Sequence, residues 1–338
     1  MVDSSPVFRP LLRSAWHITW SRPWLFLFGF AASFLGVGGL WELLFNSTSA
    51  SITAAESLAT IGAWLGNGDA VNMVRGFFRA LREAPGTLLI TTVLFLVIAL
   101  VTLCIFWLGA IGNGALVDST LKSTHHLKTT LRGEWAVGKR FAFSLLGIHL
   151  IVKIVLIGLF IVAGLFLEAA IHTRGILFLF AMAAFIVLVG GSLATTFLTL
   201  YAACYRVIRG FSIREALRAS FTLFRSYWLV ALELATLFFL ISLVIGLITF
   251  LVLLILTIPF VFLIIMFQLL HIPGGINLVI TFWLIIAAIL FACATALFTT
   301  LQTVSWTLFF LQLTEGGAIS KLVRLFQKNK EAKNQRIT

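Results

Sequence analysis

The sequence predicts an all-α, polytopic membrane protein, a helical bundle with six transmembrane helices. Its composition is 61% hydrophobic and 11% charged, and 33 Phe and 10 Trp exceed what the surface of a soluble domain accommodates. Several apolar runs are longer than the ~20 residues that a helix needs to cross a ~30 Å hydrocarbon core. None shows the alternation over ~10 residues that is typical of an outer-membrane barrel. A helical bundle is therefore the expected class.

The formal net charge of +12 is explained by where the basic residues lie. Most of the 24 Lys and Arg fall into segments that the predicted spans leave on one side of the membrane: the start of the chain, 113–140, 204–227 and the tail. Because Lys-rich and Arg-rich loops face the cytoplasm, both termini are expected there. The excess suits anionic lipid headgroups, so membrane lipid is the expected partner and nucleic acid is not.

Six spans are predicted within a single transmembrane domain at 1–320, followed by a basic cytoplasmic tail at 321–338. Residues 46–86 are expected to form an extracytoplasmic loop. In the first span, the small-residue pairs Gly29/Ser33 and Ala32/Gly36 either let another helix approach closely or are simply the small residues common in membrane helices. The second span is expected to end in the turn signal "GNG". The predicted spans are 24–45, 87–111, 145–166, 175–203, 228–250 and 276–310.

The stretch 228–270 contains one acidic and no basic residue. As one helix it would be about 65 Å long, twice the membrane thickness, so a turn is expected within it. Two full spans there would place the basic tail outside, against the positive-inside rule. The sequence therefore predicts a re-entrant or outer-leaflet segment at 251–275, marked by Pro259 and "HIPGG". Seven or eight crossings are the alternative.

The stretch "SIREALRASFTLFRSYWL" at 212–229 concentrates charge in a chain that has little of it. Ser212 followed by Glu215 is a capping box and predicts the start of a helix. Helical spacing then puts Arg214, Arg218 and Arg225 on one face, in the pattern of an interfacial amphipathic helix. The opposite, apolar face is predicted to hold Ile213, Ala216, Leu217, Phe221 and Phe224.

Related stretches stand in the same place before two other spans. "LLRSAWHITWSRPWL" (11–25) precedes the first span, and "RGEWAVGKRFAFSLL" (132–146) precedes the third. Interfacial amphipathic helices are therefore expected before spans one, three and five. The similarity is either a threefold repeat or the chance likeness of amphipathic helices.

A few polar residues lie inside the apolar runs. His149 and Lys153 are four residues apart. They are either a proton-handling pair, or a histidine that bonds a neighbouring group beside a lysine that extends to the membrane interface. Glu233 is expected at a similar depth, which suggests an intramembrane Lys153–Glu233 pair because an unpaired carboxylate is costly there. Gln268 and Gln302 are expected to join helices or to line a cavity near the re-entrant segment.

The motifs of common enzyme classes are missing from the sequence. It contains no G-x-S-x-G, Walker A, dinucleotide-binding or H-E-x-x-H pattern. His125 and His126 have no Cys, Asp or Glu cluster beside them, as a metal site would need. The three cysteines lack metal-type spacing and are expected to be small buried residues. No catalytic residue, metal or cofactor is predicted, and the protein is not expected to be an enzyme.

The elbow "YRVIRGFSIREALRASFTLFRSYWLVAL" resembles a broad group of prokaryotic polytopic membrane proteins. The group is allied to YciC-like proteins and to the membrane domain attached to some glycerophosphoryl diester phosphodiesterases. The first span, "AWHITWSRPWLFLFGFAASFLGVGGLWELLF", is similar to members from small-genome candidate-phyla bacteria. The resemblance implies a six-span bundle in the cytoplasmic membrane of a prokaryote, with no established activity. The phosphodiesterase catalytic domain has no counterpart here.

These observations predict a non-enzymatic integral membrane protein, a scaffold or accessory subunit that contacts anionic lipid. A transporter or channel, with a site near the 251–275 segment, is the alternative. Whether a protein partner or a second copy of the chain joins it is left open. The residues predicted to contact lipid are Arg206, Arg209, Arg214, Arg218 and Arg225.

Overall fold

The protein is all-helical wherever its structure is described, which confirms the predicted class. The computed structural model describes residues 8–35, 85–127, 130–172, 176–272 and 274–315, and these contain no β-strand. Five of the helices, α5 to α9, are long and apolar enough to cross a membrane. The helices are α1 (Phe8–Ser21), α2 (Leu25–Ser33), α5 (Pro85–Thr124), α6 (Leu131–His172), α7 (Ile176–Ile208), α8 (Ile213–Leu269) and α9 (Gly275–Glu315).

Six spans are predicted and five such helices are described. The predicted first span, 24–45, coincides with α2 only at its start, and its remainder lies outside the described residues. The predicted loop at 46–86 lies outside them except for its last two residues, and the tail at 321–338 lies outside them entirely. Five apolar helices nevertheless mark the chain as a multi-pass membrane protein.

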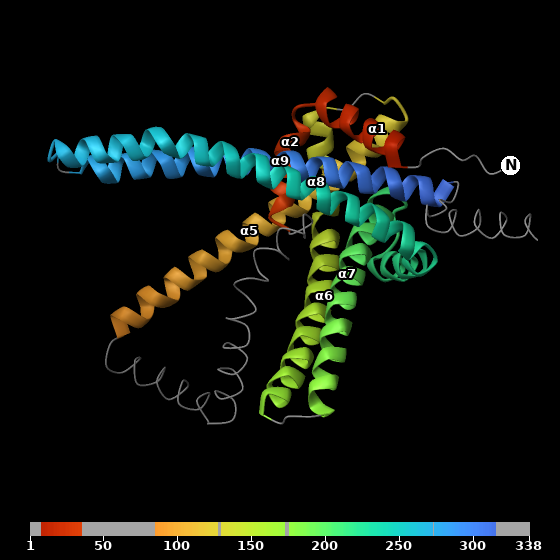
Figure 1. The fold of residues 1–338 in the computed structure, drawn as a ribbon. Coiled ribbons are helices and arrows are strands. Elements are labelled where there is room, and N and C mark those ends of the chain that lie inside the picture. The colour runs from red at the N-terminus through yellow and green to blue at the C-terminus, as the bar shows by residue number, and fades with distance from the viewer. Residues whose placement is uncertain (1–7, 36–84, 128–129, 173–175, 273, 316–338) are drawn as a thin grey trace, which may run out of the picture.

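All the helices meet in one packed centre, which we call the hub. The middle of the hub is the second half of α9, where residues 296–311 are buried on nearly every side. Around it lie α1, α2 and the hub ends of the other helices (Figure 1). A helix that is buried all round belongs in the interior of a bundle, and Phe309 and Phe310 are fully buried there. The hub consists of α1, α2, 106–124, 131–149, 197–208, 213–242 and 296–315.

The remaining parts of the long helices leave the hub as arms. Figure 1 shows the α8–α9 hairpin, the α6–α7 hairpin and the single helix α5 diverging from the centre. Each arm segment is about 30 to 40 Å long at 1.5 Å per residue, close to the thickness of a hydrocarbon core. Their described side chains are largely apolar, and Phe95 and Phe262 are more than two-thirds exposed. Residues 85–105, 176–205 and 234–314 contain no Asp, Glu, Lys or Arg.

Helix α8 is continuous where the sequence predicts a break. Its backbone stays helical from Ile213 through Pro259 to Leu269, apart from a kink at Tyr227. The turn predicted within 228–270 is therefore wrong, because the chain leaves the helical conformation only after Leu269, whereas the re-entrant or outer-leaflet placement of 251–275 stays a prediction. A helix of this length does not need to turn inside the membrane, because 213–242 packs into the hub and only the rest of α8 forms an arm. Proline within an apolar helix is tolerated where neighbouring groups satisfy the freed carbonyl.

The glycines of "GNG" are contact points between helices, and the predicted turn at 112–114 is wrong. Helix α5 runs through them to Thr124. A Cβ atom on Gly112 would lie 2.5 Å from the Phe28 carbonyl oxygen of α2. On α2 itself, a Cβ on Gly29 would lie 2.6 Å from the Ala296 carbonyl oxygen and would collide with Thr300. The close-approach interpretation of Gly29 is therefore confirmed, and α2 is fixed against both α5 and α9.

Two helices end on a histidine in the left-handed conformation. His126 (φ 55°) follows α5, and the next N–H, of Leu127, donates to the Lys122 carbonyl at 2.9 Å. His271 (φ 47°) follows α8, and Ile272 donates to the Phe267 carbonyl at 3.3 Å. Both are Schellman-type ends, a position usually taken by glycine. His126 therefore has a structural role, because it ends helix α5.

Candidate functional site

The elbow between α7 and α8 is built by the predicted capping box. Ser212 is extended (φ −64°, ψ 162°), and its Oγ accepts a hydrogen bond from the Glu215 N–H at 3.4 Å. Glu215 Oε2 in turn accepts from the Ser212 N–H at 2.9 Å and from the Ser212 hydroxyl at 2.7 Å. These bonds satisfy groups that a helix start leaves free, so α8 begins where the sequence predicts.

The capping box predicts a pH dependence of the α8 start. The Ser212 backbone N–H, followed by its hydroxyl, holds the pKa of Glu215 below its ordinary value. The ionised Glu215 carboxylate therefore stabilises the start of α8 fully above the ordinary carboxyl pKa, and this stabilisation is lost as the pH falls through the lowered pKa of the folded state. Hydrogen exchange at the Glu215 amide should accelerate over that acidic window, relative to the amides of the α8 interior. In Glu215→Gln, which keeps the box without the charge, this extra acceleration should disappear.

One exposed stripe of α8 combines basic and aromatic side chains. Its members follow one another every three or four residues and therefore share a face. Phe221 is 57% and Trp228 is 52% exposed, between and beside the arginines. Phe221 was predicted on the apolar face, and that placement is wrong. The other four predicted apolar residues are buried or partly buried against the hub. We call the exposed set the α8 stripe: Arg214, Arg218, Phe221, Arg225 and Trp228.

The two remaining predicted arginines lie at the end of α7 and in the turn. Arg206 is half-buried, its Nη1 donates to the Phe211 carbonyl at 2.6 Å, and its guanidinium lies 5.5 Å from the centre of the Phe141 ring. These contacts hold the α7–α8 turn against α6. Arg209 is exposed beside them. The structure thus brings all five arginines to one elbow, but Arg206 is engaged within the protein.

The same combination of residues recurs on two other helices, in the stretches that the sequence comparison relates. On α1, two exposed arginines are followed by two tryptophans that are 51% and 54% exposed. At the start of α6, basic and aromatic residues again share an exposed face. The sequence signalled related stretches but not this shared arrangement. We call these the α1 stripe (Arg9, Arg13, Trp16, Trp20) and the α6 stripe (Arg132, Trp135, Lys139, Phe143).

A buried carboxylate in the hub was not recognised in the sequence. Glu134, in the first turn of α6, is fully buried, and its Oε2 accepts from the Trp24 indole N–H at 3.1 Å. The rings of Phe28 and Trp135 stack beside this bond, with centroids 6.3 Å apart. The bond joins the start of α2 to the start of α6. The signal in the sequence is an acidic residue near a predicted helix start, within the amphipathic stretch "RGEWAVGKRFAFSLL".

The polar candidates of α6 lie where its arm leaves the hub. His149 is 6% exposed, and its Nε2 lies 3.5 Å from the Asn113 side-chain nitrogen of α5. The Lys153 ammonium lies 5.7 Å from the centre of the Phe106 ring. The histidine thus has a neighbouring side chain, as the structural interpretation expects, and a proton-handling role stays a prediction. Lys153 and Glu233 are both half-buried, and their pairing also stays a prediction.

The two predicted glutamines lie at opposite ends of the α8–α9 hairpin. Gln268 is exposed at the tip, whereas Gln302 is 5% exposed within the hub. Residues 275 to 302 of α9 span about 40 Å at 1.5 Å per residue, so the two amides do not share a site. Gln302 therefore does not line a cavity near 251–275, and the same role for Gln268 stays a prediction.

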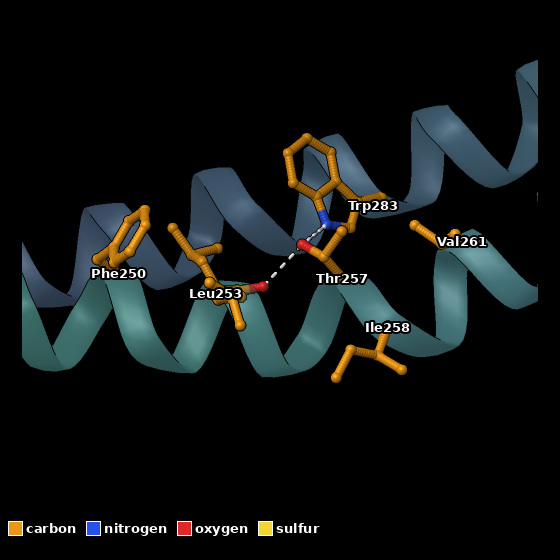
Figure 2. Close-up of a pocket in the computed structure, with 7 residues that line it drawn as sticks. Phe250, Leu253, Thr257, Ile258, Val261 and Trp283 are labelled. Carbon is orange, nitrogen blue, oxygen red and sulfur yellow. Dashed lines mark hydrogen bonds between the residues drawn. The ribbon is translucent and has the colours of Figure 1, made fainter.

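A recess of about 580 Å³ lies on the α8–α9 arm. Figure 2 shows Trp283 of α9 over α8, its indole N–H donating to the Thr257 hydroxyl oxygen at 3.1 Å. Thr257 in turn donates to the Leu253 carbonyl at 2.8 Å. The remaining walls are apolar, including Phe250 and Val261. The hydrogen bond joins the two helices of the hairpin, and the recess offers only apolar surface beside it.

Metal-ligand chemistry has no cluster to support it in the described chain. No three His, Cys, Asp or Glu side chains within the described ranges lie together as ligands. Cys204 is buried, with its Sγ 4.0 Å from the Thr307 hydroxyl. Cys104 and Cys293 are exposed on the arms, so the prediction that all three are buried is wrong for these two.

Comparisons of the chain with family models, with curated proteins and with solved structures found no match. The chemistry of the described residues therefore carries the functional argument.

Proposed function

We propose that the protein is a non-enzymatic scaffold or accessory subunit of a prokaryotic cytoplasmic membrane, and that it binds anionic lipid through its hub. The single observation that carries this proposal is the recurrence of an exposed basic and aromatic stripe on α1, α6 and α8. Each stripe precedes a predominantly apolar helix segment: α2 after the α1 stripe, and the arm segments of α6 and α8 after the other two. The three stripes form the membrane-surface contact of the molecule.

The pairing of side chains within a stripe suits the boundary between water and lipid. Guanidinium and ammonium groups attract anionic headgroups by about 1 kcal/mol for each basic residue near the surface. Tryptophan and phenylalanine rings occupy the headgroup level and the upper acyl region. In the α8 stripe, Phe221 stands between two arginines, so one apolar ring is inserted where phosphates are bound on either side.

The arms supply the membrane-spanning part in this proposal. Their apolar lengths match one hydrocarbon thickness, and α2 lies at the start of the predicted first span, 24–45. Both termini then lie in the cytoplasm with the basic segments. The proposed layout agrees with the resemblance of the elbow to the YciC-like group. A transport site at 251–275 loses its premise, because α8 is continuous there.

The proposal is tested by measuring lipid enrichment around single-charge variants. The full chain is reconstituted in nanodiscs with a mixture of phosphatidylglycerol and phosphatidylcholine, and the bound lipids are quantified after detergent extraction. Arg214→Gln should lower the relative affinity for phosphatidylglycerol roughly fivefold, as about 1 kcal/mol implies. Lys122→Gln is the matched control, because Lys122 already pairs with Asp118 at 2.5 Å. Equal losses in the two variants, or no enrichment in the unmodified protein, would contradict the proposal.

A further inference from the structure

A groove of about 440 Å³ runs beside the α8 stripe. Tyr205 at the end of α7 lines one part of it, and Leu223 supplies apolar wall from α8. Its polar lining from α8 consists of Glu215, Arg218, Thr222 and Ser226, which lie within about three turns of helix. The groove therefore combines an anion, a cation and hydroxyl groups in a space large enough for a small polar group.

The hydroxyl and carboxylate groups of the groove leave several oxygens able to accept hydrogen bonds. The Thr222 hydroxyl donates to the Arg218 carbonyl at 3.1 Å, and the Ser226 hydroxyl donates to the Thr222 carbonyl at 3.1 Å. Each hydroxyl has only one hydrogen to donate, so both oxygens are left to accept. Glu215 uses Oε2 for Ser212 and is exposed, and Oε1 accepts no hydrogen bond from the described residues. The groove thus offers several acceptors and a single cation.

Arg218 and Glu215 are neighbours but are not joined. They are three residues apart on α8, which puts their Cβ atoms about 5–6 Å from each other on the helix surface. Within the described part of the chain, the Arg218 guanidinium makes no ion pair and donates no hydrogen bond. A ligand that carries a negative and a positive group at a similar separation can therefore bind both side chains at once.

We propose that this groove binds the headgroup of a phospholipid with a primary ammonium, as in phosphatidylethanolamine. The phosphate binds Arg218 at the rim. The ammonium, which has three N–H donors, binds Glu215 and the hydroxyl oxygens of Thr222 or Ser226. This inference rests on the proposed function, since it takes the elbow to lie at the lipid surface.

The chemistry of the groove distinguishes this headgroup from two other common ones. A choline group has no N–H to donate, and its recognition relies on aromatic cages, whereas only Tyr205 is aromatic here. A glycerol headgroup carries no positive charge to offset the Glu215 carboxylate. The groove therefore adds a headgroup preference to the general attraction of the stripes for anionic lipid.

The test titrates the delipidated full chain, in detergent, with dioleoyl phosphatidylethanolamine, phosphatidylcholine or phosphatidylglycerol. Bound lipid is counted by native mass spectrometry. The unmodified protein should bind phosphatidylethanolamine about tenfold more tightly than phosphatidylcholine, a modest selectivity for one charge pair. Glu215→Gln keeps the capping box but removes the carboxylate, so the two affinities should become equal. Glu315→Gln, which removes an exposed carboxylate at the end of α9, should preserve the preference.

The outcomes separate this inference from the proposed function. Binding of phosphatidylglycerol without any preference for ethanolamine over choline would overturn the inference alone. If the unmodified protein does not bind phosphatidylglycerol, the proposed function is overturned. An ethanolamine preference that survives in Glu215→Gln, or that is lost equally in Glu315→Gln, would place the recognition elsewhere and overturn the inference. Circular dichroism of each variant checks that its helices are intact.

Discussion

Gly112→Ala is expected to destabilise the hub by about 1 to 3 kcal/mol, the usual cost of overpacking. The added Cβ would lie 2.5 Å from the Phe28 carbonyl oxygen, 2.9 Å from the Ala32 backbone nitrogen and 3.0 Å from the Ala31 Cβ. Backbone atoms cannot rotate away, so α2 must move from α5. Because the two helices pack closely throughout this region, the displacement also disturbs the contact of α2 with α9.

Gly158→Ala is the matched control for this prediction. It introduces the same methyl group on the α6 arm, where no atom beyond the adjoining backbone of α6 itself lies within 4 Å of the new position. Alanine is the better helix former by about 0.5 to 1 kcal/mol, so the control should be neutral or stabilising. Thermal unfolding of both variants in detergent micelles, followed by circular dichroism, measures the difference. A shift of equal sign in the two midpoints would show that Gly112 is not a contact point.

Trp24→Phe is expected to lower the stability of the hub by about 1.5 to 3 kcal/mol, the range for hydrogen bonds to charged groups. The substitution keeps an aromatic ring but removes the donor that Glu134 Oε2 accepts from. Glu134 is fully buried, so water cannot replace the indole without opening the junction of α2 and α6. Chemical unfolding in mixed micelles gives the free energy of unfolding for the comparison.

Two further variants make this prediction specific to the hydrogen bond. Trp228→Phe removes an indole N–H from a ring that is 52% exposed, and should change the free energy of unfolding by less than about 0.5 kcal/mol. Combining Trp24→Phe with Glu134→Met replaces both partners by apolar groups and should recover much of the loss. If Trp24→Phe proves as mild as Trp228→Phe, the buried carboxylate does not depend on the indole.

The features predicted correctly from the sequence are those with local causes. The capping box at Ser212 and Glu215 is set by neighbours three residues apart, and it appears in the structure as expected. The "GNG" glycines were misread because a glycine pattern serves a tight turn and a close helix contact equally well. The contact depends on α2, which is far away in the sequence. The continuity of α8 was missed for a related reason, since the sequence does not reveal which half of an apolar helix is covered by protein.

The predicted site was recovered in part. Helical spacing correctly placed Arg214, Arg218 and Arg225 on one exposed face. Phe221 was misplaced because its hydrophobicity suggested burial, although its angular position lies among the arginines. The engagement of Arg206 with Phe141 requires α6 to pack beside the elbow, and no local pattern announces that contact.

The uncharged stretch from Leu234 to Thr314 has a consequence for how the chain is inserted. The two arm segments of the α8–α9 hairpin carry no Lys or Arg, so they contain no topology signal of their own to determine which end stays in the cytoplasm. The orientation of the hairpin across a membrane is therefore determined by the arginines in the first turns of α8. The two arm segments are thus oriented by residues that are synthesised before them. A single basic residue placed at the tip of the hairpin, near His271, would favour the opposite orientation.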